Sequence, residues 1–174
     1  MTAKSITFQL GYGQYWIGEP GTAIDQSLYN GYSGLIQTRA GDNHATIMTG
    51  TRFGLIGLTY EQLETAPEVS LDSWDDVVEV SMAFATTKGG LEGHGYQDDP
   101  LDSLPMISAA GAGSYRVRVH ARGRDHGAEF EENYGDPVEF HLIQTWPAPL
   151  AAEVRHKLTD ALGARIRARG DCDS

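Results

Sequence analysis

The 174-residue chain carries 13 basic and 24 acidic side chains, giving a formal net charge of −11 at pH 7. A surface this negative repels DNA, RNA and anionic lipid, which argues against a nucleic-acid-binding or membrane-surface protein. No apolar run approaches the ~18 residues of a membrane-spanning helix. The lone cysteine, Cys172, cannot form an internal disulfide, and no signal peptide is recognisable, so we expect a cytoplasmic protein.

Alternation of apolar and polar residues predicts strands along most of the first 149 residues. In chain order they cover residues 6–17, 34–39, 45–50, 54–59, 74–86, 114–122 and 137–145. Turn-forming residues separate them, and only short helices are expected, at residues 23–30 and 60–65. The pattern predicts an all-β fold, an antiparallel two-sheet β-sandwich that is jelly-roll-like, over residues 1–149.

The faces of two strands can be assigned from this alternation. In residues 114–122, valines are expected in the core, whereas Arg116, Arg118 and His120 are expected to face outward. The arginines are expected to pair with neighbouring acids, for example with Glu139 across a hairpin. In residues 137–145, the apolar side chains that include Phe140 are expected in the core, with Glu139 and the lone His141 facing outward.

The last 25 residues differ in character from the rest. Apolar residues recur every fourth position, at Leu150, Val154, Leu158, Leu162 and Ile166. This spacing predicts an α-helix of about 18 residues beginning near Pro149, as a C-terminal helical extension at residues 150–174. The apolar stripe of such a helix packs on a sheet or on a second copy of the chain, which would give a homodimer.

No catalytic, metal-binding or cofactor-binding motif is evident. His120 and His126 lack a third ligand at a suitable spacing, so we expect no metal site. A nucleophile elbow and a phosphate-binding loop are also missing, so we expect no cofactor. An enzyme remains an alternative that would need a pocket in which carboxylates gather with His94, His120 or His126.

Acidic residues concentrate in one segment. Between Glu61 and Asp102 there are eleven acids and one base, Lys88. This density favours binding to a basic protein surface, with Tyr96 as an aromatic anchor among the acids. The predicted partner-binding residues are Asp72, Asp75, Asp76, Tyr96, Asp98, Asp99 and Asp102.

Aromatic residues gather early in the chain. Five of them lie within 21 residues, between Tyr12 and Tyr32. Such residues either fill a core or form a binding face, and both interpretations stay open. The candidate aromatic binding face comprises Tyr12, Trp16, Tyr29 and Tyr32.

The order of several sequence blocks resembles the competence protein J family. The blocks are Leu10-Gly-Tyr-Gly-Gln-Tyr-Trp-Ile17, Asn30-Gly-Tyr-Ser-Gly-Leu-Ile-Gln37, Gly113-Ser-Tyr-Arg-Val-Arg-Val119 and Glu139-Phe-His-Leu-Ile-Gln-Thr-Trp-Pro147. The known member of that family inhibits a DNA-entry nuclease. The resemblance spans residues 8–149, and the family lacks the C-terminal tail. It implies a nuclease inhibitor, or an immunity protein against a nuclease toxin.

We therefore predict a non-catalytic acidic binding protein that inhibits a basic partner, most simply a nuclease or nuclease toxin. A nuclease holds DNA with lysine and arginine, and carboxylates can occupy the same groove. The alternative is a sandwich module that binds a carbohydrate or small molecule, or a subunit of a larger assembly.

Overall fold

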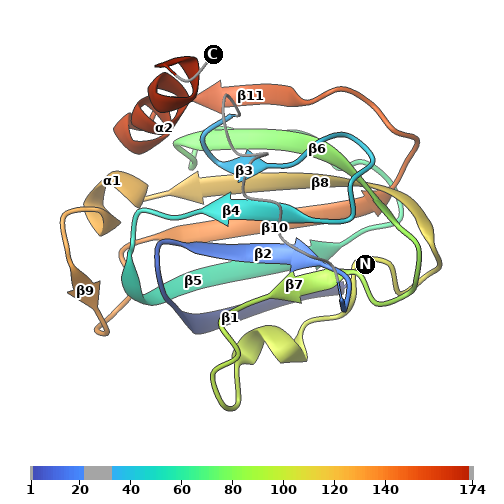
Figure 1. Cartoon of the computed structure of the whole chain (residues 1–174), viewed down its shortest axis with the longest axis horizontal. Helices are drawn as coiled ribbons and strands as arrows, with labels where there is room; N and C mark the ends of the chain where they lie inside the picture. Colours follow the sequence, from blue (N-terminus) through green and yellow to red (C-terminus); the bar gives the residue numbers. More distant parts are fainter. Residues whose placement is uncertain (1, 22–32, 173–174) are drawn as a thin grey trace.

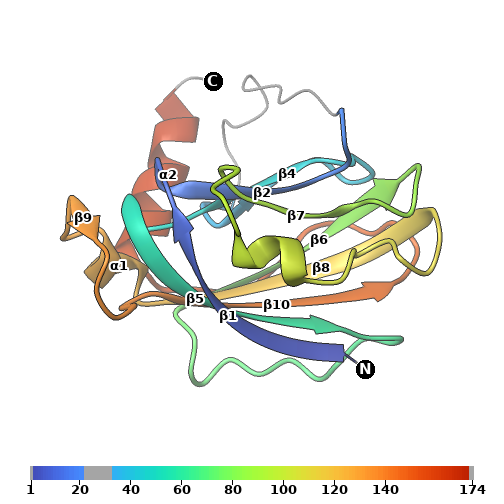
Figure 2. The same ribbon diagram turned by 90° about the horizontal axis from the view of Figure 1, so that it is seen from below.

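Two β-sheets lie face to face in the computed structural model, which describes residues 2–21 and 33–172 (Figures 1 and 2). The expectation of a mostly β chain with two sheets and a C-terminal helix is confirmed. The helix expected at residues 23–30 lies outside the described residues. No helix in the described part of the chain is long and apolar enough to cross a membrane.

The larger sheet has the strand order β1-β5-β10-β8-β6-β11, and the short β9 pairs with β5. We call it the large sheet. Its strands are β1 (Thr2–Leu10), β5 (Phe53–Gln62), β6 (Asp76–Phe84), β8 (Gly113–Arg122), β9 (Glu132–Asn133), β10 (Phe140–Pro147) and β11 (Val154–Leu158). β5 continues through residues 60–62, where a short helix was expected, so that prediction is wrong.

The large sheet is mixed, whereas the sequence predicted antiparallel pairing throughout. β5 runs parallel to β10 and to β9. β6 and β10 are each antiparallel to β8, so β5, β6 and β10 share one direction. The chain therefore needs the long segment at residues 63–75 to return from the end of β5 to the start of β6.

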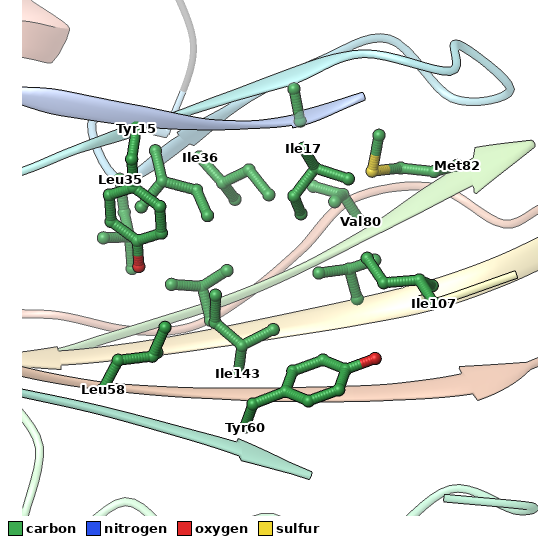
Figure 3. Close-up of a cluster of buried hydrophobic side chains, with 14 of the residues drawn as sticks. Tyr15, Ile17, Leu35, Ile36, Leu58, Tyr60, Val80, Met82, Ile107 and Ile143 are labelled. Carbon is green, nitrogen blue, oxygen red and sulfur yellow. The ribbon is translucent and has the colours of Figure 1, made fainter. Parts of the chain in front are cut away.

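The second sheet, which we call the small sheet, has the order β3-β4-β2-β7. Its strands are β2 (Gln14–Gly18), β3 (Ile36–Gln37), β4 (Ala45–Met48) and β7 (Gly90–Glu92). Figure 3 shows Tyr15 and Ile17 of the small sheet facing Leu58, Tyr60 and Ile143 of the large sheet across a buried apolar layer. This layer is the core that joins the sheets.

Residues 6–17, predicted as one strand, form two strands in different sheets. The chain turns at Gly11, Tyr12 and Gly13, where Tyr12 has a φ of 57° and Gly13 a φ of 69°. The turn sends β1 into the large sheet and β2 into the small sheet. Tyr12 consequently lies at a corner of the fold, and it does not share a strand with Trp16.

The outer face of β8 is covered, which overturns the expectation of a solvated His120. Arg116, Arg118 and His120 are 1–4 % exposed. Arg118 donates to the Pro67 and Glu68 carbonyls of the segment at residues 63–75, and Arg116 donates to two carbonyls of the chain that follows β10. Burial lowers the pKa of His120 to about 4, so this ring is neutral at physiological pH.

The pairing of the two arginines with neighbouring acids is confirmed, but the partner differs from the expected one. Glu79 of β6 lies between them and accepts from Arg116 Nε at 2.8 Å and from Arg118 Nε at 2.9 Å. Hydrogen bonds from His156, Arg116 and Arg118 outweigh burial and lower the pKa of Glu79. The outer face is thus held together by a buried ion-pair network.

The helix predicted from residue 150 onward is wrong for its first half. Val154–Leu158 forms β11, which pairs antiparallel with β6, and the helix α2 spans Ala161–Cys172. Polar side chains hold this strand in place, because His156 contacts Glu79 and Lys157 donates to the Trp74 carbonyl at 2.6 Å. Val154–Leu158 therefore adds a strand to the large sheet, and the C-terminal helix is confined to Ala161–Cys172.

The start of α2 depends on side chains from distant segments. Asp125 of the short helix α1 (Arg124–Gly127) accepts from the backbone N–H groups of Ala161 and Leu162. Asp160 accepts from the Gly163 N–H at 2.7 Å. A Cβ on Gly34, which has a φ of +84°, would lie 2.6 Å from the Gly163 carbonyl oxygen, so a glycine is needed for this close approach.

Glu19 gives the fold a pH-dependent contact. Its carboxylate accepts from the Ala85 and Thr86 N–H groups, the Thr86 hydroxyl and the Asn43 amide, which joins the end of β2 to the turn after β6. Burial raises the pKa of Glu19, but these hydrogen bonds outweigh it and lower the value from 4.5 to about 2.

We expect Glu19→Gln to reduce stability above pH 4.5 and to flatten the fall in stability between pH 4.5 and 2. A carboxylate whose pKa is depressed in the folded state stabilises the fold above its unfolded pKa, and the contribution disappears as the pH falls through the folded value. Urea unfolding at a series of pH values measures this, with Glu64→Gln, at an exposed site, as the control. An unchanged pH profile would contradict it.

Candidate functional site

The six aspartates predicted to bind a partner do not form one surface. Asp72 and Asp75 precede β6, whereas Asp98, Asp99 and Asp102 lie around the 3-10 helix η2 (Pro100–Ser103). η2 contacts β1, at one edge of the large sheet, while β6 lies next to the opposite edge strand, β11. The fold therefore separates the acids into two groups.

Two of these aspartates are buried, which corrects their assignment to an exposed surface. Asp76 is 0 % exposed and Asp99 is 7 % exposed. The Asp99 carboxylate accepts from the Leu101 N–H at 3.0 Å and caps η2. Asp75 is half-buried and accepts from the Gly123 N–H. Asp72, Asp98 and Asp102 remain exposed, as predicted.

Asp76 belongs to a buried ion-pair cluster around Arg124, whose side chain is fully buried. Arg124 Nη2 lies 3.0 Å from Asp76 Oδ2, and its Nε lies 2.6 Å from Asp160 Oδ2. Arg124 also donates to the Gly34 and Met48 carbonyls. The cluster connects β6, α1, the start of α2 and the small-sheet side of the molecule, so its role is structural.

A second buried polar chain resembles catalytic machinery in composition but is sealed from solvent. Tyr15 Oη lies 2.7 Å from His141 Nδ1, and His141 Nε2 lies 2.8 Å from Glu139 Oε1. All three residues are at most 1 % exposed. Burial, followed by the charge of Glu139, raises the pKa of Tyr15 well above its usual value. The chain joins the two sheets within the interior.

This chain also reverses the predicted faces of β10. Glu139, His141 and Ile143 point into the molecule, whereas Phe140 and Leu142 point outward. Glu139 accepts from the Gly50 and Thr51 N–H groups, so its carboxylate is satisfied in the interior. Burial raises the pKa of Glu139, but His141 and then Thr51 outweigh it and lower the value.

The structure does bring predicted aromatic residues together at an exposed site. We call it the aromatic cluster: Tyr12, Trp16, Phe53, His94 and Tyr96. Its members come from the turn between β1 and β2, from β2, from the start of β5 and from the chain after β7. Tyr12 is 71 % exposed and Tyr96 is 39 % exposed, so the cluster presents aromatic surface to solvent.

His94 lies at the centre of the aromatic cluster. Its ring centroid is 4.8 Å from that of Trp16, 6.0 Å from that of Tyr12 and 6.1 Å from that of Tyr96. His94 Nε2 lies 2.9 Å from the Gln14 carbonyl oxygen, which fixes the ring. Tyr12 also packs edge-on against Phe53, with centroids 5.0 Å apart. Ring contacts thus hold both tyrosines in place.

Carboxylates border the aromatic cluster. Glu92 is the cross-strand neighbour of Trp16, and Asp98 and Tyr96 line one hollow of about 200 Å³. We call the exposed acids Glu92, Asp98 and Asp102 the acidic rim. Burial raises the pKa of Asp99, the Leu101 N–H opposes the rise, the charge of Asp102 adds to it, and His94 opposes it. His94 and Asp102 are therefore both close enough to Asp99 to affect its ionisation.

The sequence predicted Tyr12, Trp16 and Tyr96 as binding residues, named His94 only for an alternative enzyme pocket, and did not point to Phe53. Tyr29 and Tyr32 lie outside the described residues. The signal for His94 was its position two residues before Tyr96, in Gly93-His94-Gly95-Tyr96. Phe53 carried no such signal, because only the return of β5 beside β1 brings it to Tyr12. Among the described residues, no group of three or more histidine, cysteine, aspartate or glutamate side chains is arranged to hold a metal ion.

Comparisons with known proteins define the fold alone. No family model matches the chain, and no curated protein matches it. A solved structure named "Crocagin biosynthetic gene J" is similar, with a TM-score of 0.50 and 13% identity. The match covers 86% of this chain and 100% of that protein. At this identity the similarity supports a shared architecture and assigns no activity.

Proposed function

We propose that this chain is a non-catalytic binding protein that docks on a basic partner protein through the aromatic cluster and the acidic rim. The observation that carries the proposal is the exposure of Tyr12 and Tyr96, at 71 % and 39 %, with the exposed Asp98 lining the same hollow as Tyr96. Tyrosines are the usual buried anchors of protein interfaces, and they lose little entropy when already packed.

The net charge of the chain supports a basic protein as the partner. The net charge of −11 favours encounter with a cationic protein, and the acidic rim directs that encounter to the aromatic cluster. Arg52, whose guanidinium carbon lies 5.6 Å from the Phe53 ring centroid, illustrates how a cation can stack on these rings. A lysine or arginine of the partner can stack in the same way on the exposed tyrosines.

Within this proposal, the specific partner is a nuclease or nuclease toxin, and the chain acts as its inhibitor or immunity protein in the cytoplasm. Support comes from the charge and from the resemblance to the competence protein J family. We further propose that the two sheets constitute a β-sandwich of the jelly-roll type. The similarity to the crocagin protein adds no functional support, because it extends only to the fold.

A second candidate is a small-molecule-binding module. It is favoured by a half-open pocket of about 440 Å³ where β5, β8 and β10 meet, a size typical of ligand sites. Tyr115, Ile107 and Trp146 are among its lining residues. A ligand there would leave the aromatic cluster free, so mapping the contact surface separates the two candidates.

The acidic rim is tested by capture from the native host at low and high salt. We expect a basic protein to be retained by the wild type at low salt and released at high salt, and its nuclease activity to be inhibited by the wild type. Asp98→Asn with Asp102→Asn should slow association and weaken the salt dependence, because rim charges act mainly on the association rate.

Glu68→Gln with Asp72→Asn is the matched control, since it removes two exposed charges from the other acidic group. The association rate of this control should be closer to that of the wild type. Equal loss in both double variants would show that net charge acts without a defined site. Retention of an acidic partner, or of none, would contradict the proposal.

A further inference from the structure

A groove of about 400 Å³ lies on the large sheet, and it shares Thr7 with the hollow that Tyr96 and Asp98 line. Outward-facing residues of β1, β5, β8 and β10 line it, together with Trp74 from the segment that leads into β6. Its lining side chains include Ser5, Thr7, Thr59, Trp74, Arg122 and Phe140. The groove is large enough for a small organic molecule.

Arg122 is stacked between two aromatic rings in this groove. Its guanidinium carbon lies 5.4 Å from the Trp74 ring centroid and 5.0 Å from the Phe140 ring centroid. Trp74 is itself fixed, because its carbonyl accepts from Lys157 and its ring packs on His120 with centroids 5.4 Å apart. Stacking leaves the N–H groups in the guanidinium plane available to a ligand.

Arg122 also lacks an ion-pair partner in the part of the chain that the structure describes. Arg116, Arg118 and Arg124 each contact a carboxylate at 2.6–3.0 Å, whereas Arg122 contacts none within 4.0 Å. The nearby Asp75 carboxylate accepts from the Gly123 N–H. An exposed, unpaired guanidinium in a chain of this acidity is a cation available to an external anion.

The floor of the groove suits an apolar or planar body. Gly57 has no side chain there, and a Cβ would lie 2.6 Å from Phe140 Cδ1, so the Phe140 ring rests directly on the β5 backbone. Ser5 and Thr59 hydroxyls share one hydrogen bond of 2.9 Å on the far side. The Ser5–Thr59 contact uses only one of the two hydroxyl hydrogens. Among the hydrogen bonds of the described residues, none involves the Thr7 hydroxyl, so it and the second hydrogen are available to a ligand.

We propose that this groove binds a small organic carboxylate, with the carboxylate on Arg122 and an aromatic or apolar body against Phe140 and Gly57. A guanidinium binds a carboxylate through two parallel hydrogen bonds. One cation matches one negative charge, whereas a dianionic phosphate would remain half-neutralised beside an acidic protein. The residues that carry this site, Arg122, Phe140 and Gly57, are not members of the aromatic cluster or the acidic rim.

The experiment titrates the intact chain with phenylacetate while the indole N–H signal of Trp74 is followed by NMR. Phenylacetamide and phenethylamine have the same ring without the negative charge, and inorganic phosphate has charge without the ring. We expect phenylacetate to shift the Trp74 signal in the micromolar to millimolar range, and the other three probes to bind at least about tenfold more weakly.

Arg122→Gln should weaken phenylacetate binding at least about tenfold, whereas Arg165→Gln, at an exposed arginine of α2, should leave it unchanged. Equal binding of phenylacetate and phenylacetamide by the wild type would overturn the proposal without any variant. So would the absence of phenylacetate binding, or tighter binding of phosphate. Retained affinity in a folded Arg122→Gln protein would overturn it as well.

Discussion

Arg124→Met is expected to lower the free energy of unfolding by about 3–5 kcal/mol, because it removes the close cation from two buried carboxylates. Arg167 Nη1 lies farther away, 4.0 Å from Asp76 Oδ2. Arg124, Asp76 and Asp160 are at most 5 % exposed, so water cannot replace the lost contacts. The arginine makes hydrogen bonds to both carboxylates and to two carbonyls, and all of these acceptors lose a donor.

The loss should depend on pH in a defined direction. Burial raises the pKa of Asp76, and the Arg124 charge is among the factors that oppose the rise. Without Arg124 the folded-state pKa rises further, and a buried acid with a raised pKa destabilises the fold above its unfolded pKa. The destabilisation should therefore be smaller near about pH 4 than at about pH 8.

Urea unfolding monitored by tryptophan fluorescence measures this effect, with Arg165→Met as the control at an exposed site. Adding Asp160→Asn to Arg124→Met should restore part of the stability, because one unpaired charge is removed while an oxygen remains to cap α2. A loss below about 1 kcal/mol for Arg124→Met would show that the cluster is not a principal stabilising contact.

Replacing both exposed tyrosines, by Tyr12→Ala and Tyr96→Ala, should weaken partner binding by about 2–4 kcal/mol, or roughly 30- to 1000-fold. The two rings are exposed in the free chain, so their area becomes buried only in the complex. Their packing against His94 and Phe53 reduces the entropy lost on binding. The effect should appear mainly in the dissociation rate.

Leu150→Ala is the matched control for the tyrosine variants, because Leu150 is a 51 % exposed apolar residue on the connection between β10 and β11. Surface plasmon resonance with the captured partner gives both rate constants. The tyrosine double variant should unfold at nearly the wild-type urea concentration, which separates lost binding from lost structure. Unchanged dissociation in that variant would remove the aromatic cluster from the interface.

The strands that could be predicted from sequence are those in which one face is apolar. β6 and β8 were found because Val78, Val80, Val117 and Val119 alternate with polar residues and do face the core. What alternation missed was that the polar face of β8 is also buried. The charges did carry a signal for this burial, because the acidic Glu79 of β6 is the cross-strand partner of the basic Arg118 of β8.

The errors on β10 and Asp76 share one cause, which is that polar groups find hydrogen-bond partners inside the molecule. The faces of β10 were reversed because Glu139 and His141 find backbone and tyrosine partners in the interior. Asp76 was placed on the surface because its partner, Arg124, lies 48 residues away. Local periodicity carries no information about such distant pairs.

The C-terminal pattern shows a different limit. A four-residue apolar spacing at positions 150–166 fits a helix, but β6 would otherwise be an unpaired edge strand, and β11 covers that edge. The candidate site was also predicted only in part, because it depends on how distant segments of the chain come together. Tyr12, Trp16 and Tyr96 were visible as aromatic residues, whereas their gathering around His94 depends on the turn between the two sheets.

Photo-cross-linking in the native host tests directly whether the aromatic cluster meets a basic protein. A photo-reactive amino acid is introduced at position 12 or 96, and at position 150 as the control. We expect positions 12 and 96 to capture the same basic protein, with capture reduced by Asp98→Asn and Asp102→Asn, and position 150 to capture none of it. Capture of that protein from position 150 alone, or of only acidic proteins from positions 12 and 96, would contradict the proposed function.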